Sequence, residues 1–441
     1  MNRLNITFCS FPDFSGNAKA LYEYMQKQYK KNMNYTWIVY NESSVKILKE
    51  KKINVILIGT DEFKKYIKTT DVFFTTHVNL SGDKEKTSDA LYVELWHGIG
   101  PKPVGFLANK LSKSDRKWYN SLREVIDYII VPTDFWKVIF SSIFNVEGDR
   151  IKSLGLPLLD EIKNSEGKKN INNILNIDID KYKKVILYAP TFKSGCGRTL
   201  ESKINPNNIM DLKEYSDEKL NKYLENNNYL LIVKRHPSEE CEYKILETDN
   251  IKNISSEMLE KNGMDINNIL NAFDLLITDY SSLGIEFNFL NRPVIYLSTY
   301  INEYKDNRGI IFDDYDFWTD SIYCDCYDDL INNIDRYINK KYISKNRNLY
   351  YGKLTDGGCK NICDYFFEDY KLKESVNKYK SVLLDTLNQN RVLEDTINEQ
   401  ENTIKKLTES DIELRQIKNS KGYKIVENVR KIKYIYRKKD K

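Results

Sequence analysis

Short runs of apolar, β-branched and aromatic residues recur up to about residue 365, and helical or turn-rich stretches separate them. Such runs are typical of strands buried on both faces of a parallel sheet. The early runs are LNITFCS, YTWIVY, VILIG, DVFFTTH, ALYVELWHG and YIIVPT. Between the first two, Gly16 and Asn17 precede a helical pattern in the stretch FSGNAKALYEYMQKQY. The pattern therefore predicts an α/β domain over residues 1–165.

The same rhythm begins again after the polar stretch KNSEGKKN at 163–170, which we interpret as a domain boundary. The later runs are KVILYAPTFK, YLLIVKRHP, DLLITDYSSLGIEF and RPVIYLS. They predict a second α/β domain over 166–368. Two doubly wound domains facing each other across a cleft are the architecture that this order favours, because ligands of open α/β sheets bind outside the carboxyl ends of the strands.

From about residue 370 the composition shifts to Leu, Glu, Lys, Asn and Gln, with no glycine or proline before Gly422. A seven-residue spacing favours a long helix, and a coiled coil, over 369–419. The seam residues are Val376, Leu383, Asn390, Ile397 and Ile404, with Tyr379, Leu393, Leu407 and Leu414 three residues later. We expect a homo-oligomer through 376–417. Because polar residues interrupt the seam, a solitary helix, or one packed back on its own chain, stays open.

The last segment, 420–441, reads SKGYKIVENVRKIKYIYRKKDK and sets apolar residues on one helical face among lysines and arginines. This combination is typical of helices that lie on anionic membrane surfaces. A solvated basic terminus is the alternative. No stretch of the sequence approaches the roughly 20 apolar residues of a membrane span. We therefore expect a peripheral protein on the cytoplasmic face of the membrane.

The overall charge and the cysteine content narrow the class of protein. Formal net charge is only +4 over 441 residues, so the chain as a whole is not a nucleic-acid binder. Seven cysteines, an odd number without framework spacing, indicate free thiols in a reducing compartment, the cytoplasm. The pairs Cys324 with Cys326 and Cys359 with Cys363 have no histidine beside them, and we interpret them as structural thiols.

One of only three histidines, His97, ends the run ALYVELW and precedes Gly98, Pro101 and Pro103. At the carboxyl edge of a sheet an imidazole can reach into a cleft, and its ordinary pKa of about 6.5 suits it to take a proton at neutral pH. A general base is the functional interpretation. A hydrogen-bonded structural histidine is the alternative.

A second histidine ends another run, where Lys234, Arg235 and His236 stand in a row before Pro237. Three potential cations at one strand end are costly to assemble without an anion. Charged oxygens are the strongest partners of guanidinium and protonated imidazole groups. The cluster therefore predicts phosphate binding.

The stretch LLITDYSSLGIEF places Thr278, then Ser281 and Ser282, between a strand and a helical pattern. Either serine can cap the helix, and the free backbone N–H groups of a first turn suit a pyrophosphate. Simple capping is the alternative. Glu286, about one turn further, could reach ribose hydroxyls. Thr191 follows a further strand and precedes a loop with two glycines, a weak phosphate signal by itself.

No metal-ligand pattern accompanies these residues. The DDYD at 313–316 contains an Asp-x-Asp, but it follows GIIF in a polar stretch and is typical of a turn. We therefore expect no cofactor and no metal in the chemistry, so that protein donors must stabilise the charge of any leaving nucleotide.

Taken in order, these motifs resemble the CDP-glycerol glycerophosphotransferase family, polymerases of teichoic acids and capsules with a GT-B fold. The resemblance covers roughly residues 10–365. It is carried by GNAKALYEYM, LWHGIGPKPVGF, ILYAPTFK, VKRHP, LLITDYSSLGIEF, RPVIYLSTYINEYKDNRGIIFD and LTDGGCKNICDYFF. The chain departs from the usual pattern with Ile99 and Gly100 in place of Thr-Pro, and with Lys193 where arginine is common. These departures bear on the acceptor more than on the reaction.

The resemblance implies a role for each matching residue. His97 would deprotonate an acceptor hydroxyl, and Lys102, after the Trp-His-Gly turn, would bind an acceptor phosphate. The implied donor-site residues are Thr191, Arg235, His236, Thr278, Ser281, Ser282 and Glu286. Among these, His236 would bind the donor phosphates, the serines would hold the pyrophosphate, and Glu286 stands where the family usually has aspartate.

The reaction implied by the resemblance is transfer of a polyol phosphate, glycerol phosphate first, from a CDP-polyol to an acceptor hydroxyl with release of CMP. Donors would be CDP-glycerol or CDP-ribitol, and acceptors a glycan or a polyol phosphate that could be lipid-linked. A GT-B glycosyltransferase that uses a nucleotide sugar is the nearest rival, since the same cleft would serve it. A noncatalytic coiled-coil assembly factor is a third hypothesis, which the presence of both His97 and His236 disfavours.

Overall fold

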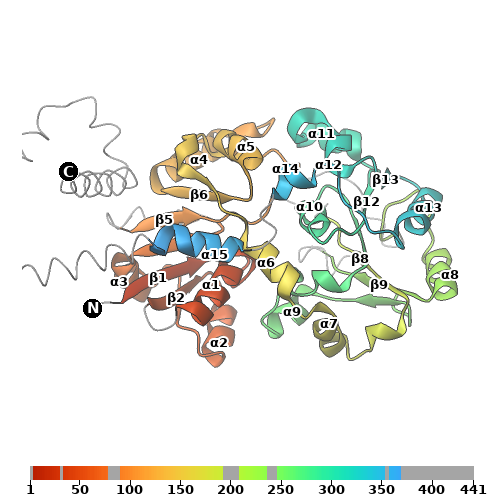
Figure 1. The fold of residues 1–441 in the computed structure, drawn as a ribbon, viewed down its shortest axis with the longest axis horizontal. Helices are drawn as coiled ribbons and strands as arrows, with labels where there is room; N and C mark the ends of the chain where they lie inside the picture. Colours follow the sequence, from red (N-terminus) through yellow and green to blue (C-terminus); the bar gives the residue numbers. More distant parts are fainter. Residues whose placement is uncertain are drawn as a thin grey trace, which may run out of the picture. The chain divides into compact units, whose positions relative to one another are not determined.

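The computed structural model contains two parallel β-sheets flanked by helices (Figure 1). It describes residues 3–29, 33–77, 90–191, 208–235, 246–352 and 357–368. The chain divides into two compact units, residues 1–87 with 92–359 and residues 88–91 with 360–441. Every strand residue except the first residue of β5 belongs to the first unit, which also holds the site described below.

Within the described residues the first sheet has seven strands in the order β3-β2-β1-β4-β5-β6-β7. β1 pairs in parallel with both β2 and β4, so the order reverses between β1 and β4. In doubly wound sheets the crevice at such a reversal is where ligands bind. The strands are β1 (Leu4–Cys9), β2 (Met33–Val39), β3 (Val55–Leu57), β4 (Val72–Thr75), β5 (Leu91–Glu94), β6 (Tyr128–Val131) and β7 (Ile151–Ser153).

The second sheet repeats this topology with the order β10-β9-β8-β11-β12-β13 in the described chain. β8 pairs in parallel with β9 and with β11, so its reversal lies between β8 and β11. The strands are β8 (Lys184–Tyr188), β9 (Tyr229–Val233), β10 (Ile251–Asn253), β11 (Leu275–Thr278), β12 (Val294–Leu297) and β13 (Tyr323–Cys324). The predicted pair of doubly wound sheets is confirmed.

Helices lie in most of the described connections between successive strands, as is usual for parallel pairing. Those that belong to the first sheet are α1 (Gly16–Gln28), α2 (Glu42–Glu50), α3 (Asp61–Tyr66), α4 (Lys113–Val125), α5 (Asp134–Phe144) and α6 (Pro157–Asn164). The following helices are α7 (Gly167–Leu175), α8 (Asp217–Asn227), α9 (Ser256–Lys261), α10 (Ser282–Asn288), α11 (Ile301–Asn307), α12 (Tyr315–Thr319), α13 (Tyr327–Tyr337), α14 (Arg347–Tyr351) and α15 (Gly358–Cys363). Short 3₁₀ turns lie between several of these elements.

The central strands are buried on both faces, which explains their continuous apolar runs. Ile129, Ile130 and Val131 of β6 are fully buried, as are Leu230 and Ile232 of β9. One apolar cluster extends from residues of the first sheet to residues of the second. The two sheets therefore share a continuous core.

Each strand that the hydrophobic pattern predicted is present, and several of them end four or five residues before the end of the run that predicted them. Three further strands were not predicted: β7, β10 and β13. Each lies at an edge of its sheet and has only two or three residues. The predicted free cysteines are confirmed where the structure describes them, at Cys9, Cys324, Cys326, Cys359 and Cys363.

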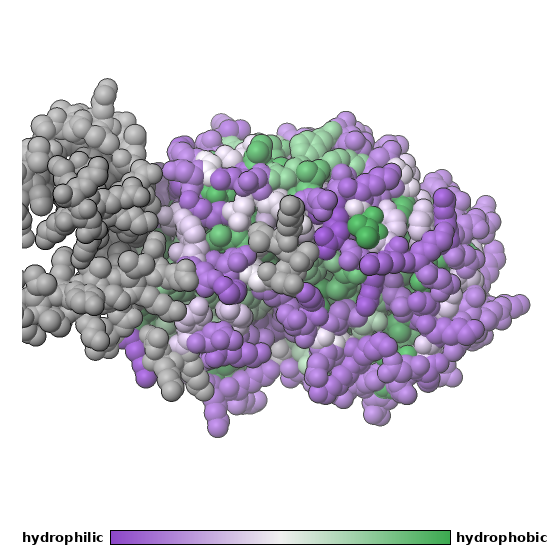
Figure 2. Space-filling view, in the orientation of Figure 1, coloured by the Kyte–Doolittle hydropathy of each residue, from purple (hydrophilic) through white to green (hydrophobic). Residues whose placement is uncertain are grey.

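The surface in Figure 2 is mostly hydrophilic, with smaller hydrophobic patches between the hydrophilic residues. The most exposed large apolar side chain among the described residues is Val138 on α5, at 71%. No helix in the described part of the chain is long and apolar enough to cross a membrane.

Several predictions concern residues outside the described ranges. They are the coiled coil of 369–419, the basic tail of 420–441, and His236 with its neighbour Pro237. The stretch of sequence after Thr191, with Lys193 and its two glycines, also lies outside them. The structure does not test the predictions for these segments.

Candidate active site

The turn that carries His97 begins where β5 ends. Asn17, fully buried on α1, donates from Nδ2 to the carbonyl oxygens of Leu95 at 3.1 Å and Trp96 at 2.9 Å. Trp96 has a positive φ of 54°, and its backbone N–H donates to Glu94 Oε1 at 2.7 Å. These bonds hold the sharp turn after the strand, so that the His97 side chain projects from the carboxyl edge of the sheet.

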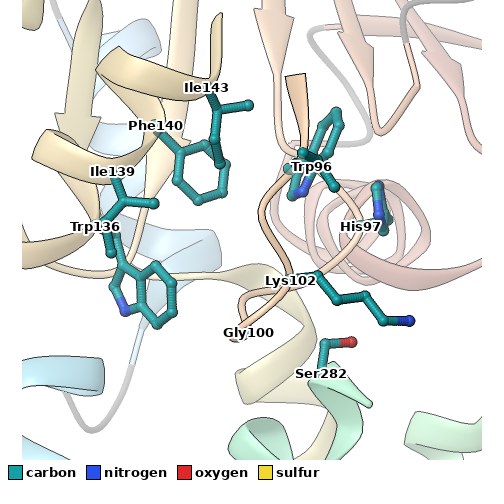
Figure 3. A pocket seen from close by; sticks show the side chains of 11 residues that line it. Trp96, His97, Gly100, Lys102, Trp136, Ile139, Phe140, Ile143 and Ser282 are labelled. Carbon is teal, nitrogen blue, oxygen red and sulfur yellow. The ribbon is translucent and has the colours of Figure 1, made fainter. Parts of the chain in front are cut away.

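His97 opens onto a cavity of about 160 Å³. Figure 3 shows its two walls, with side chains of α5 on one and His97 and Lys102 on the other. Ser282, at the start of α10, also lines it, so both halves of the core contribute residues. The lining residues are Trp96, His97, Gly98, Gly100, Lys102, Val104, Trp136, Ile139, Phe140, Ile143 and Ser282.

Although water reaches His97 through the cavity, protein atoms surround the ring and remove much of its hydration. This loss of hydration lowers the pKa of His97, although the side chain stays exposed to the cavity, and nearby His77 and Lys102 lower it further. A hydrogen bond to the backbone of Thr76 opposes the shift. The imidazole is therefore neutral at pH 7, with one nitrogen occupied at Thr76 and the other able to accept a proton.

Two glycines allow the His97 turn to pack directly on α10. A Cβ atom on Gly98 would lie 2.4 Å from Glu286 Oε1, and one on Gly100 would lie 3.0 Å from the Cα of Ser282. The backbone N–H of Ile311 also donates to the carbonyl of Pro101 at 2.9 Å. The turn is thus packed closely against α10, and a methyl group at Gly100 would require Ser282 to shift by a few tenths of an ångström.

Replacement of Gly100 by alanine tests this packing. The added methyl group would press on the Ser282 backbone, which cannot rotate away as a side chain can, so we expect a loss of about 1 to 3 kcal/mol of stability. Thermal unfolding of the Gly100→Ala variant measures it. Gly148→Ala is the matched control, because a Cβ there meets no atom within 4 Å. Equal melting temperatures for both variants would contradict the close packing.

Glu286 lies beneath the turn and is buried, with 5% of its surface exposed. Burial raises the pKa of its carboxyl group to about 8, and Asp265 adds to the shift, while a hydrogen bond from the Ile99 backbone opposes it. Its Oε1 has no hydrogen-bond partner among the described residues. At pH 7 the group is therefore mostly a neutral acid. The predicted contact to a ribose stays a prediction.

The predicted cap of α10 is confirmed as Ser281. Its hydroxyl oxygen accepts a hydrogen bond from the Leu283 backbone N–H at 3.2 Å. Ser282 is the first helical residue and lies on the cavity, where it faces the His97 turn. Their contact to a pyrophosphate stays a prediction.

The reversal point of the second sheet contains Thr191 and Asp279, which follow β8 and β11. The Thr191 hydroxyl and backbone N–H donate to the Asp279 carboxylate at 2.9 to 3.0 Å. Thr191 is half-buried, so it keeps access to the crevice. Thr278 does not fit the predicted donor role, because it is fully buried and its hydroxyl donates to the Ala189 carbonyl at 2.6 Å. It stabilises the strand ends instead.

Two residues of the basic cluster after β9, Lys234 and Arg235, are buried. Arg235 is only 1% exposed, donates from Nη2 to the Ile209 carbonyl at 2.6 Å and lies over the Tyr188 ring. Lys234 donates from Nζ to Ser256 Oγ at 2.7 Å. Arg235 is thus buried in this structure, and its predicted contact to the donor stays a prediction. The predicted phosphate contact of His236 also stays a prediction.

Lys102, predicted to bind an acceptor phosphate, is half-buried and lines the cavity together with His97. Burial lowers the pKa of its ammonium group, Asp279 opposes this shift, and Arg308 adds to it. An anion in the cavity would therefore meet a poorly hydrated cation. The structure brings together His97, Lys102, Ser282 and Glu286, from the two halves of the core.

Two participants in the site were not predicted. Asn17 was noted only as a helix start, although its side chain holds the end of β5. His77 follows β4 and stacks on His97, with ring centroids 4.4 Å apart. The signal for His77 was present, since DVFFTTH ends an apolar run in a histidine as the His97 run does.

Two doubly wound sheets that share a core, with a cavity lined from both, define a GT-B-like fold of transferases. A solved structure of the wall teichoic acid polymerase TagF aligns with a TM-score of 0.65, at 22% identity, over 84% of this chain and 89% of that chain. At this level of identity the likeness concerns the fold. The predicted GT-B fold class is confirmed.

Residues 1–360 match the model of the family described as CDP-Glycerol:Poly(glycerophosphate) glycerophosphotransferase, and the chain belongs to this family of transferases. It is similar to a teichoic acid glycerol-phosphate primase of Bacillus subtilis, with 29% identity over 68% of this chain and 75% of the relative. A teichoic acid poly(glycerol phosphate) polymerase of Bacillus spizizenii is 28% identical, over 68% of this chain and 75% of the relative. The predicted family and enzyme class are confirmed.

Proposed function

We propose that the protein transfers glycerol phosphate from CDP-glycerol to an acceptor hydroxyl and releases CMP, in the assembly of a teichoic acid-like surface polymer. The observation that carries this proposal is the cavity that joins the neutral imidazole of His97 to Lys102 and Ser282. A base, a cation and a helix start around one cavity suit an alcohol that attacks a phosphate. Membership of the glycerophosphotransferase family supports the donor.

In the proposed reaction the acceptor oxygen attacks the β-phosphorus of CDP-glycerol. A bond forms between that oxygen and phosphorus, the bond from phosphorus to the bridging oxygen breaks, and CMP leaves with the bond electrons. The acceptor proton passes to the free nitrogen of His97, which later returns it to water. General base catalysis of this kind contributes roughly 10² to 10⁴ in rate, so donors around the phosphates must supply the larger share.

The donor phosphates require protein partners. We assign to His236 the diphosphate contact, with Ser281, Ser282 and Thr191 beside it at the carboxyl ends of β8 and β11. Lys102 binds the acceptor's own phosphate in this proposal. No step is assigned to a metal. The one cluster of possible ligands in the described chain, Asp325 with Cys326 and Asp329, includes no residue that lines the cavity.

A donor panel tests the reaction. The protein is incubated with CDP-glycerol, CDP-ribitol or a set of sugar nucleotides, with a short-chain alkyl glycerol phosphate as the acceptor, and released nucleotides are measured by chromatography. We expect CMP from CDP-glycerol, at a rate that EDTA changes less than twofold. Turnover of a sugar nucleotide alone would establish the glycosyltransferase instead, and no turnover of any donor would contradict an enzymatic role.

We also propose that residues 420–441 bring the enzyme to anionic lipid, near a membrane-assembled acceptor, and that residues 376–417 associate in a homo-oligomer. The basic and apolar residues of the tail support the first part, and the heptad spacing supports the second. Sedimentation with phosphatidylglycerol vesicles compares the full chain with a chain truncated after residue 419. Equal binding of the two would contradict the lipid role of the tail, and a monomer in light scattering would contradict the oligomer.

A further inference from the structure

The carboxyl ends of two neighbouring strands place two histidines in contact. β4 and β5 are adjacent in the first sheet, and the Leu95 backbone N–H donates to the Thr75 carbonyl at 2.7 Å. His77 follows β4 and His97 follows β5, and their rings stack with centroids 4.4 Å apart and an angle of 28° between the planes. The stack therefore connects the proposed base to the neighbouring strand.

Trp96 completes a cluster of three rings. Its centroid lies 4.2 Å from that of His97 and 5.8 Å from that of His77, the latter at an angle of only 10°. Phe11 contacts His77 as well, with centroids 5.8 Å apart, and 56% of its own surface is exposed. One ring of the cluster, His97, is thus in contact with two aromatic faces.

His77 is itself held in place, although no substrate role is assigned to it. Its backbone N–H donates to Thr75 Oγ1 at 3.2 Å, and its Nδ1 is buried without a hydrogen-bond partner among the described residues. A hydrogen bond to the Thr76 backbone acts on His77 as it does on His97. The same short segment therefore fixes both imidazoles.

We propose that His77 is a positioning residue for the proton transfer, whose ring face fixes the plane of His97 and keeps water from that side. This proposal rests on the proposed function. The rings of His77 and Trp96 pack on His97 with centroid distances of 4.4 Å and 4.2 Å, so they cover part of the His97 ring and restrict its rotation.

Repulsion between the two rings favours a stack in which only one of the two histidines carries a proton charge. Two imidazolium rings in contact would repel each other, so a proton on His97 excludes one on His77. Burial lowers the pKa of His77, which keeps that ring neutral at pH 7 and able to act as the aromatic face.

Other titratable groups surround the stack and remain the same in every variant of His77. Lys102 on the His97 turn adds positive potential, and Glu286 on α10 is mostly neutral at pH 7. Glu94 on β5 accepts the Trp96 N–H. Burial raises the pKa of Cys9 on β1 to about 12, so this thiol does not titrate near neutral pH. A change in the pH at which kcat/KM falls on the acidic side therefore reports on His77 and His97.

The test measures kcat/KM for CMP release from CDP-glycerol between pH 5 and 8, with the alkyl glycerol phosphate as acceptor. His77→Ala and His77→Gln remove the aromatic face, and His77→Phe retains it without a titrating nitrogen. With the face removed, water also reaches the side of His97 that His77 covered, and the pKa of His97 rises toward about 6.5, so activity at pH 6 falls to about a quarter of the plateau. We also expect a plateau kcat roughly tenfold lower, with KM for CDP-glycerol unchanged.

We expect His77→Phe to keep the wild-type dependence of kcat/KM on pH below neutrality, and most of the plateau kcat. Phe11→Ala is the matched control, because Phe11 touches His77 from another side and has no ring contact with His97 in the structure. A wild-type profile for both His77→Ala and His77→Gln would overturn the proposal, as would a His77→Phe variant as impaired as they are. If circular dichroism shows that His77→Ala does not fold, the comparison of His77→Gln with His77→Phe tests the proposal instead. If the wild type releases no CMP, the proposed function itself fails.

Discussion

Replacement of His97 by alanine should lower kcat for CMP release from CDP-glycerol at least a hundredfold, while leaving the affinity for CDP-glycerol nearly unchanged. The ring is neutral at pH 7, projects into the cavity and has one nitrogen free to accept the acceptor proton. A positioned general base is worth roughly 10² to 10⁴ in rate. Since the base acts on the acceptor, its loss removes an interaction of the transition state and not one of donor binding.

Calorimetry with CDP-glycerol and steady-state rates with the alkyl glycerol phosphate separate the two effects. His236→Ala is the contrasting variant, since a residue that binds the donor phosphates should weaken the affinity for CDP-glycerol when it is removed. His97→Ala with more than a tenth of the wild-type rate would exclude His97 as the base. Unchanged donor affinity in His236→Ala would remove the phosphate role from that histidine.

The pH dependence of the same rate follows from the direction of the pKa shift. A base whose pKa is lowered stays deprotonated, and active, at more acidic pH than an ordinary histidine would. We therefore expect kcat/KM to hold its plateau at pH 6. The raised pKa of Glu286, about 8, predicts a second change of activity above pH 8 if its neutral form is required beneath the turn.

The central strands could be predicted because burial on both faces leaves a continuous apolar run that periodicity detects. The three strands that were missed, β7, β10 and β13, have the sequences IKS, IKN and YC. Each is an edge strand whose pattern mixes one buried residue with partly exposed or polar ones. Such short segments are fixed by pairing with a neighbour, and this is not visible in local sequence.

The candidate site could be predicted as far as the strand ends, because carboxyl ends of parallel strands meet at one edge. That rule identified His97, Thr191 and Ser281. It does not say which side chain of consecutive residues turns toward the crevice, and so Thr278 and Arg235 were assigned to the ligand although both are buried. Contact between His77 and His97 depends on β4 lying beside β5, which the sheet order shows and the chain order does not.

The second large effect is expected at Lys19, which is buried on α1 with 1% of its surface exposed. Its Nζ donates to Glu161 Oε1 on α6 at 2.7 Å and to Asn268 Oδ1 at 2.7 Å. Asp265 accepts a hydrogen bond from the Gly16 backbone at 2.8 Å. Burial disfavours the charged ammonium, yet Asp265 and Glu161 together outweigh it and raise the pKa of Lys19. The cation therefore holds residues 265–268 against α1 and α6.

Lys19→Met should destabilise the protein by about 3 to 5 kcal/mol, because it leaves the acidic partners of a buried ion pair without their cation. The urea midpoint of unfolding, followed by circular dichroism, measures the loss. Lys27→Met on the last turn of the same helix is the matched control and should cost less than about 1 kcal/mol, since Lys27 is exposed. Urea midpoints that fall equally in the two variants would contradict the role of Lys19 in holding residues 265–268 against α1 and α6. Because Asn17 on the same helix holds the end of β5, a shift of α1 should also lower kcat, and a Lys19→Met variant that is both less stable and slower would tie the buried ion pair to the position of His97.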